Sequence, residues 1–279
     1  MRLTSNTYGK ARVRVMRVYR EGAYNEVREL SVQAMLEGDF AAAYTDGDNG
    51  TVVATDTIKN IVNIVARENL RAAAETFAEK LAARLLERYA QITRVSITCH
   101  ETRWPRAAVD GTPHPHHFVL DANGLGIATL VATRDGAAIT SGIEGFTFMK
   151  STEAGWVGYV QDNCTTLPET TDRIVATAMT ANWTWNAAPT DYEQTNALIL
   201  RTMLAEFATT YSRGVQDSLF RMAGRALEAV PELDTVTMAC PNKHYIPIDL
   251  SRFGLSSDNC VFTATDEPHG QIECTVARG

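Results

Sequence analysis

The sequence has few cysteines, no long apolar run and no cluster of basic residues. Its five cysteines are odd in number and widely spaced along 279 residues, unlike the dense disulfide frameworks of small secreted proteins. We expect reduced thiols in a cytoplasm. No apolar stretch approaches the roughly 20 residues that cross a bilayer, and Met1–Ser5 lacks the apolar core of a signal peptide.

Charge argues against polyanionic partners. The chain carries 33 acidic and 26 basic side chains, giving a formal charge of −7, and its lysines and arginines are scattered. We therefore expect no nucleic acid and no membrane among its partners. The final residues, Val276–Gly279, lack the Ser-Lys-Leu type of ending that directs proteins to peroxisomes. A cytoplasmic bacterial protein fits these features.

Apolar periodicity predicts two halves of similar organisation, as the length also suggests. In the first half it predicts strands at 10–20, 26–36, 94–102 and 117–133, with helices starting at 55 and covering 72–89. In the second it predicts strands at 138–150 (paired with 156–160), 176–185, 234–240, 244–250 and 271–276, with helices over 191–211 and 215–230. The repeated order indicates an α+β duplication. A polar turn places the boundary at Gly136, giving units 1–136 and 137–279.

The segment Thr51–Asn60 joins an apolar, β-type run to a helical pattern that begins at Thr55-Asp56. Such a junction presents unpaired backbone N–H groups and positive dipole character, which suit an anionic or carbonyl-bearing ligand. The same two residues also suit a simple helix cap without any ligand. The local pattern leaves both interpretations open.

Further motifs occur in a fixed order along the chain. They are Tyr8-Gly9-Lys10, Asp110-Gly111-Thr112-Pro113-His114-Pro115-His116, Thr165-Thr166-Leu167 with Thr171-Asp172-Arg173, and Pro241-Asn242-Lys243-His244-Tyr245. With Thr55-Asp56 they resemble the urate oxidase (uricase) family from about Tyr8 to Arg278. No single motif is as specific as a four-cysteine zinc signature, but their shared order is hard to obtain by chance.

The resemblance implies a fold, an assembly and a reaction. Uricases have two tandem tunnelling-fold units, whose antiparallel sheets are backed by helices and close into a barrel when subunits assemble. A homotetramer with active sites shared between subunits is implied. The implied partners are urate and O₂, which react with water to give 5-hydroxyisourate and hydrogen peroxide in purine catabolism. No cofactor and no metal are implied.

Four positions match the substrate-binding residues of the family. Arg173 matches an arginine that donates two parallel hydrogen bonds to urate, a geometry that a planar guanidinium provides. Gln216 matches a side-chain amide that holds the other edge of the purine, assisted by the Val215 backbone. Trp156 occupies the place of a stacking Phe. Nearby, Tyr159-Val160-Gln161 replaces the commoner Phe-Leu-Arg and Cys164 replaces a usual Tyr, so the pocket shape is expected to differ.

The family's catalytic groups match three further residues. Lys10, Thr55 and His244 correspond to a proton relay, in which a lysine activates a weakly acidic hydroxyl and an imidazole titrates near neutrality. Asn242 would face the O₂ or water site together with Thr55. Asp56 would contact the purine edge through its backbone or side chain.

Two other functions remain compatible with the sequence. His114-Pro115-His116-His117, with His100 upstream, could ligate zinc as in pterin-processing enzymes of the same fold. Uricases carry Pro-His-Pro-His here without a metal, which favours the cofactor-free interpretation. A catalytically silent purine-binding paralogue is the second alternative, and the joint presence of Lys10, Thr55 and His244 argues against it.

Overall fold

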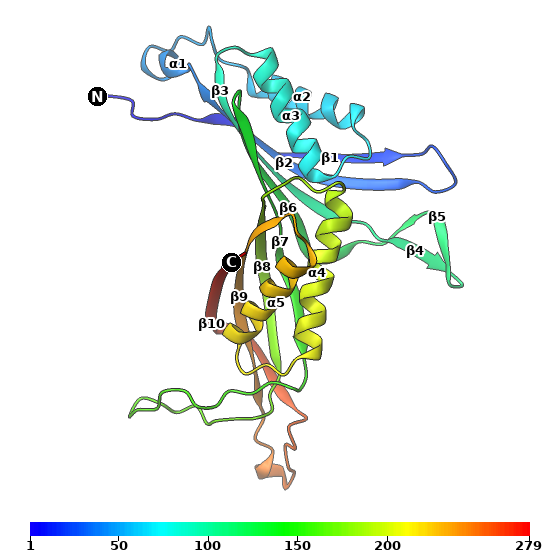
Figure 1. The fold of residues 1–279 in the computed structure, drawn as a ribbon, viewed down its shortest axis with the longest axis vertical. Helices are drawn as coiled ribbons and strands as arrows, with labels where there is room; N and C mark the ends of the chain where they lie inside the picture. Colours follow the sequence, from blue (N-terminus) through cyan, green and yellow to red (C-terminus); the bar gives the residue numbers. More distant parts are fainter. The chain divides into compact units, whose positions relative to one another are not determined.

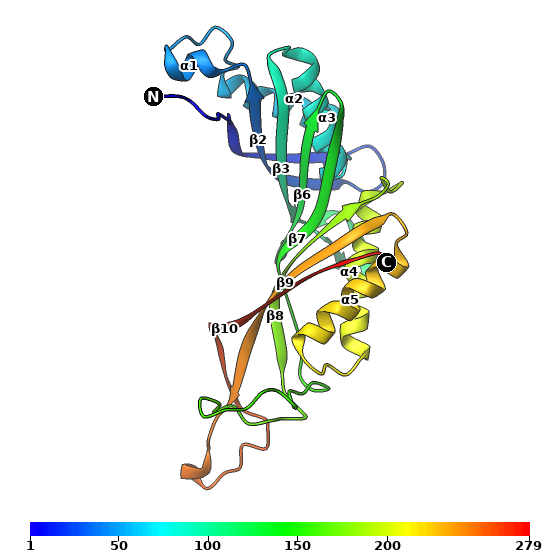
Figure 2. The same ribbon diagram turned by 60° about the vertical axis from the view of Figure 1, so that its left-hand side comes forward.

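The computed structural model describes all residues, 1–279, and the chain has an α+β fold. Contacts divide it into two compact units, Met1–Gly142 and Ile143–Gly279. Each unit has an antiparallel sheet with helices against one face (Figure 1), and the same layers are visible from a second direction in Figure 2. The predicted fold class is confirmed.

The first unit contains a sheet with strand order β1-β2-β3-β6-β7 and a separate β4-β5 hairpin. In chain order its elements are β1 (Tyr8–Tyr19), β2 (Glu26–Gly38), α1 (Ala41–Thr45), α2 (Thr55–Glu68), α3 (Ala74–Arg88), β3 (Ile92–Arg103), β4 (Arg106–Val109), β5 (Thr112–Phe118), β6 (Asp121–Thr133) and the first part of β7 (Gly136–Lys150).

Strand register in the first unit lines up apolar residues across the sheet. Val13 pairs with Val32, Val32 with Cys99, and Cys99 with Ala128. All four side chains are buried and belong to the core that also contains the apolar faces of α2 and α3. Because alternate strand residues point to the same face, this row fixes which face of the sheet the helices cover.

The second unit contains a sheet with strand order β7-β8-β9-β10. Besides the second part of β7, its elements are β8 (Val175–Trp185), α4 (Tyr192–Thr209), α5 (Val215–Ala229), β9 (Leu233–Pro247), the short 3₁₀ helix η1 (Ser251–Phe253) and β10 (Phe262–Ala277). Trp183 pairs with Val236, and Val236 with Val276. These residues pack in or against a core that includes Met203 on α4 and Leu219 on α5.

Most predicted elements are present, but three strand predictions are wrong. The segment Trp156–Val160 does not pair with β7, whose neighbour in the second unit is β8; Trp156 instead bridges Thr170. The predicted strand 117–133 is divided, because His117 belongs to β5, which pairs with β4. The predicted strands 234–240 and 244–250 form one strand up to Pro247, since Pro241 continues the pairing opposite Gln271.

The element order repeats between the two units. Each contains two strands, two long helices and two further long strands, and the division lies between Gly142 and Ile143, inside β7. The division predicted from the sequence is at Gly136, the first residue of the same strand. No helix is long and apolar enough to cross a membrane.

Candidate active site

The strand-to-helix junction predicted at Thr55 is present only on its helical side. Residues before Thr55 form a loop, so the expected strand ending at Thr55 is absent. Val53 is buried as a single loop residue, and its N–H donates to the Tyr8 hydroxyl at 2.8 Å. A tyrosine from β1 therefore supplies the partner that a neighbouring strand would have supplied. This bond ties the start of α2 to the strand that carries Lys10.

The start of α2 has no side-chain cap. Ala54 occupies the N-cap position, and Thr55 and Asp56 are the first two helical residues. Because alanine cannot accept a hydrogen bond, the first-turn N–H groups have no side-chain acceptor from the N-cap residue. The capping interpretation of Thr55 and Asp56 is therefore wrong. Both residues are exposed.

The Asp56 carboxylate is held along its own helix. It accepts hydrogen bonds from Lys59, with which it forms an ion pair, and from Asn60 Nδ2 at 3.1 Å. The bond from Lys59 is the main reason that the pKa of Asp56 lies below its usual value, and the positive charge of Lys10 contributes in the same direction. Lys10, Thr55 and Asp56 thus form one neighbourhood in the first unit.

Lys10 lies on an irregular part of β1. The pairing of β1 with β2 shifts between Lys10 and Val13, and Arg12 in this bulge has a φ of 56°. Bulges redirect side chains and recur beside active sites. The neighbouring Gly9 has no room for a side chain, since a Cβ there would lie 1.9 Å from the Ala34 carbonyl oxygen. Close strand packing therefore fixes the position of the half-buried Lys10.

Arg173 is the cation of the second unit's candidate site. Its N–H donates to the Ala154 carbonyl at 2.9 Å and its Nε donates to the Gly155 carbonyl at 3.3 Å. Burial lowers the pKa of its guanidinium from the usual value, although arginine stays protonated at neutral pH. No carboxylate forms an ion pair with it, so its terminal nitrogens remain available to an anionic ligand.

Trp156 and Gln216 both approach Gly214 on the side where a side chain would lie. A Cβ on Gly214 would be 2.8 Å from Trp156 Cζ3 and 3.4 Å from Gln216 Oε1. Val215 and Gln216 start α5, and Gly214 is its N-cap residue. Backbone bonds from Gly155 to Ser212 (2.9 Å) and from Trp156 to Thr170 (2.7 Å) join this helix start to the segment before Arg173. Arg173, Trp156, Val215 and Gln216 are therefore brought together.

Asn242 and His244 project from the same face of β9, because they are two residues apart on a strand. The Oδ1 atom of Asn242 is buried without a hydrogen-bond partner. Leaving such an acceptor unsatisfied costs about 1–3 kcal/mol, and such groups in folded proteins often have a functional reason. The pairing of Lys243 with Ala176 places this part of β9 beside the start of β8, just after Arg173.

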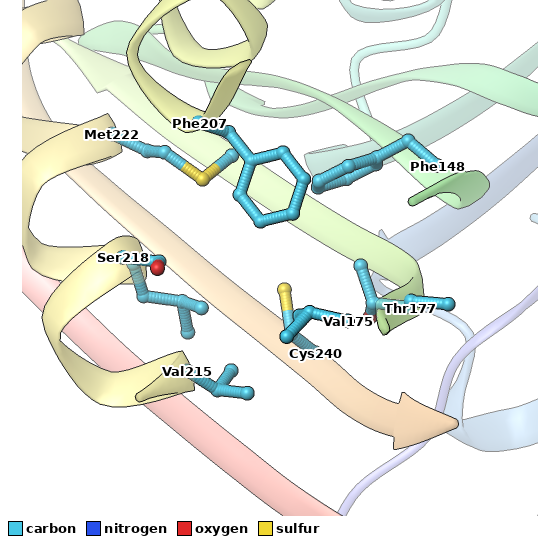
Figure 3. A pocket seen from close by; sticks show the side chains of 10 residues that line it. Phe148, Val175, Thr177, Phe207, Val215, Ser218, Met222 and Cys240 are labelled. Carbon is cyan, nitrogen blue, oxygen red and sulfur yellow. The ribbon is translucent and has the colours of Figure 1, made fainter. Parts of the chain in front are cut away.

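An apolar cavity lies against α5, the helix that carries Gln216 (Figure 3). It is lined by Phe148, Val175, Ala176, Thr177, Phe207, Val215, Ser218, Leu219, Met222 and Cys240. Its volume of about 10 Å³ is near the minimum for one water molecule. Burial raises the pKa of the Cys240 thiol to about 12, so this thiol is neutral at physiological pH. The cavity is too small to admit a purine.

The histidine cluster lies on the small β4-β5 hairpin. The His114 ring is 4.5 Å from that of His116 and 6.0 Å from that of His117, measured between centroids. His114 Nδ1 accepts the N–H of His116 at 3.5 Å. No group of three or more His, Cys, Asp or Glu side chains has an arrangement that could hold a metal ion.

The residues that support these side chains were not predicted from the sequence. Tyr8 was noted within a motif without its bond to Val53, and Gly214 was not singled out. Tyr211 was missed: its hydroxyl donates to the Thr171 carbonyl at 2.8 Å. A glycine immediately before a helix is a detectable signal for Gly214, whereas a tertiary bond such as that of Tyr211 has none.

An uncompensated guanidinium, an indole and a side-chain amide around one helix start form a candidate binding site for a flat, polar heterocycle. Comparison with known proteins gives the family. The uricase family model matches residues 6–125 and 139–273. The chain belongs to the uricase family.

Individual relatives agree over nearly the whole chain. The uricase of Arthrobacter globiformis is 39% identical over 276 residues, covering 99% of this chain and 90% of that protein. The uricase of Aspergillus flavus is 36% identical, covering 97% and 95%. The crystal structure of the Arthrobacter uricase superposes with a TM-score of 0.93 at 38% identity, covering 100% of this chain and 95% of that one.

Proposed function

We propose that this protein is a cofactor-independent urate oxidase. It converts urate, O₂ and water to 5-hydroxyisourate and hydrogen peroxide. The observation that carries the proposal is the Arg173 guanidinium, which has no acidic partner. It donates to the carbonyl of Gly155, the residue before Trp156, and both Trp156 and Gln216 approach Gly214. Membership of the uricase family supplies the substrate class.

In the proposed complex, Arg173 and Gln216 hold opposite edges of the urate anion. Arg173 donates two parallel N–H bonds, and the Gln216 amide and the Val215 backbone complete the polar contacts. Trp156 stacks on the purine ring. Because the Asp56 carboxylate is engaged by Lys59 and Asn60, its backbone N–H at the open start of α2 is the better candidate to contact the purine edge.

Proton transfer is assigned to Lys10, Thr55 and His244. A threonine hydroxyl is a weak acid, so it needs Lys10 as a proton acceptor to assist removal of a urate proton. Asn242 offers an unsatisfied buried amide oxygen on the same face of β9 as His244. Asn242, together with Thr55, would position O₂ or water above the purine plane, where a proton must be delivered to the departing peroxide.

The assembly follows from the same assignment. We propose a homotetramer whose sheets close into a barrel, and in which Lys10, Thr55 and Asp56 of one subunit complete a site with Arg173, Gln216, Trp156 and His244 of its neighbour. A cytoplasmic location is proposed from the five free cysteines, which suit a reducing compartment.

The proposal is tested by following the ultraviolet band of urate together with O₂ consumption. In buffer treated with a strong chelator, the purified protein should consume one O₂ per urate and keep its full rate. Activity that disappears on chelation and returns with zinc would favour the pterin-type alternative. Binding of urate without turnover would identify a silent paralogue.

A further inference from the structure

Tyr159 stacks on Trp156. Their ring centroids are 5.6 Å apart and their planes differ by 10°. Parallel stacking at this separation is a favourable geometry for two aromatic rings, and such pairs contribute beyond the area that they bury. An indole has two faces, and the phenol of Tyr159 covers one of them.

The loop that carries Tyr159 is held at three successive points. Trp156 and Thr170 exchange backbone hydrogen bonds at 2.7 and 3.1 Å. The Gly158 N–H donates to the Glu169 carboxylate at 2.7 Å, and the Tyr159 hydroxyl donates to the Leu167 carbonyl. The phenol is therefore anchored through its hydroxyl, next to the anchored backbone of Gly158, which restricts the plane of the ring against the indole.

The indole is also restricted at its edge. Its Cζ3 atom would lie 2.8 Å from a Cβ at Gly214, so the absence of a side chain at that position makes room for the six-membered ring. The bulky indole needs this space. These contacts occupy one face and one edge of the half-buried indole.

We infer that Tyr159 is a positioning residue for the substrate: it supports Trp156 from behind, so that a purine completes a three-ring stack in the order Tyr159, Trp156, purine. This inference rests on the proposed function. Tyr159 does not touch the purine in this arrangement and acts through the orientation of Trp156. The opposite arrangement, in which Tyr159 covers the face that the purine needs, predicts the opposite change in substrate affinity.

The test compares steady-state urate kinetics of Tyr159→Ala, Tyr159→Leu and Tyr159→Phe. Removing the aromatic ring should raise KM roughly 3–10-fold, the range that corresponds to an aromatic pair, with kcat within about two-fold of wild type. Tyr159→Leu fills the space without a π face and should behave like Tyr159→Ala, even if the alanine variant folds poorly. Tyr159→Phe keeps the ring and should raise KM by less than about three-fold.

A double-mutant cycle separates positioning from general loop stability. In a Trp156→Leu background, Tyr159→Ala should change KM by less than about two-fold, because the residue through which Tyr159 acts is gone. Tyr24→Ala is the matched control: Tyr24 is exposed in the first unit and contacts Arg106, so its removal should leave KM unchanged.

Three results overturn the inference while leaving the proposed function intact: a KM that stays at the wild-type value in the ring-deletion variants, a KM that falls, or an equal rise in the Trp156→Leu background. Failure of the wild-type protein to oxidise urate would instead overturn the proposed function, and the inference with it.

Discussion

Arg173 carries a positive charge for which the folded chain provides no acidic partner. A half-buried charge of this kind pays a desolvation cost that a bound anion can offset. Charged hydrogen bonds contribute about 1.5–3 kcal/mol each. Arg173→Ala should therefore lower kcat/KM for urate by at least about 100-fold, mainly through KM, and Arg173→Lys should restore little because an ammonium lacks the fork geometry.

Arg201→Ala provides the control for this substitution, since Arg201 lies on the exposed side of α4. Its kinetics should match wild type. A normal KM in the Arg173→Ala variant would remove the main argument for this half of the site.

Thr55 and Lys10 are expected to affect turnover more than binding. Loss of a positioned proton-transfer group typically costs about 10²–10⁴-fold in rate. Thr55→Ala and Lys10→Ala should each lower kcat within that range, with KM changed less than about five-fold. Stopped-flow measurement of urate loss separates the two effects. Lys80→Ala, an exposed lysine on α3, is the control, and a Thr55→Ala variant with normal kcat would show that the relay is wrongly assigned.

At the scale of elements, substitution of two glycines by alanine should change the free energy of unfolding in opposite directions. A Cβ at Gly9 would overlap the Ala34 carbonyl at 1.9 Å and force β1 away from β2, whereas a Cβ at Gly224, inside α5, would meet no atom within 4 Å. Gly9→Ala should lower the free energy of unfolding by at least about 2 kcal/mol. Gly224→Ala should raise it by about 1 kcal/mol.

Urea denaturation measured under identical conditions checks both values. A Gly9→Ala variant as stable as wild type would mean that β1 and β2 can separate at little cost. A destabilised Gly224→Ala variant would mean that this face of α5 packs against a partner subunit.

Long periodic elements could be predicted from the sequence, because burial leaves a repeating pattern. Ile58, Ile61, Val62 and Val65 recur on one face of α2 and are all buried, and Phe77, Leu81 and Leu85 do the same on α3. The β1-β2 hairpin was predictable for the same reason. Local apolar periodicity is sufficient where a helix or strand packs one face on a core.

Elements determined by distant partners could not be predicted. Pro241 reads as a strand break, yet pairing with Gln271 carries β9 through it. Val53 reads as a strand residue, yet a hydrogen bond from its N–H to Tyr8, 45 residues away, holds it in a loop. Of the candidate site, residue types and positions came from family motifs, whereas the support of Trp156 by Tyr159 depends on a contact that no local pattern encodes.

At the scale of the whole molecule, each unit contains one deeply buried thiol whose ionisation should weaken folding at alkaline pH. Burial raises the pKa of Cys99 and of Cys240 to about 12, compared with about 8.5 in an unfolded chain. Between these values the unfolded state loses the thiol proton and the folded state keeps it, so stability is full below about pH 8.5 and falls as pH rises.

Each thiol should contribute a slope of about 1.4 kcal/mol per pH unit in that window. Urea unfolding at pH 9 and pH 10 should therefore show a shallower loss of stability in Cys99→Ala and in Cys240→Ala than in wild type. Cys164→Ala, an exposed position, should keep the wild-type slope. Equal slopes in all four proteins would show that the thiols are not the groups responsible.

The proposed assembly makes a stricter prediction, because it divides each site between two subunits. Arg173→Ala damages one half of a site and Thr55→Ala the other, so each variant alone should be almost inactive. In a randomly mixed assembly, the subunit that contributes Arg173 to a given site carries an intact Arg173 with a probability of about one half. The subunit that contributes Thr55 to that site carries an intact Thr55 with the same probability. About a quarter of the sites should then be fully intact, and activity should recover to roughly a quarter of wild type.

Co-expression with two different affinity tags, followed by tandem purification and mass measurement, selects mixed oligomers and confirms their composition. Mixing two preparations of the same variant is the control and should recover nothing. If verified mixed oligomers stay as inactive as the separate variants, Arg173 and Thr55 serve the same site from one chain, and the shared-site arrangement is wrong.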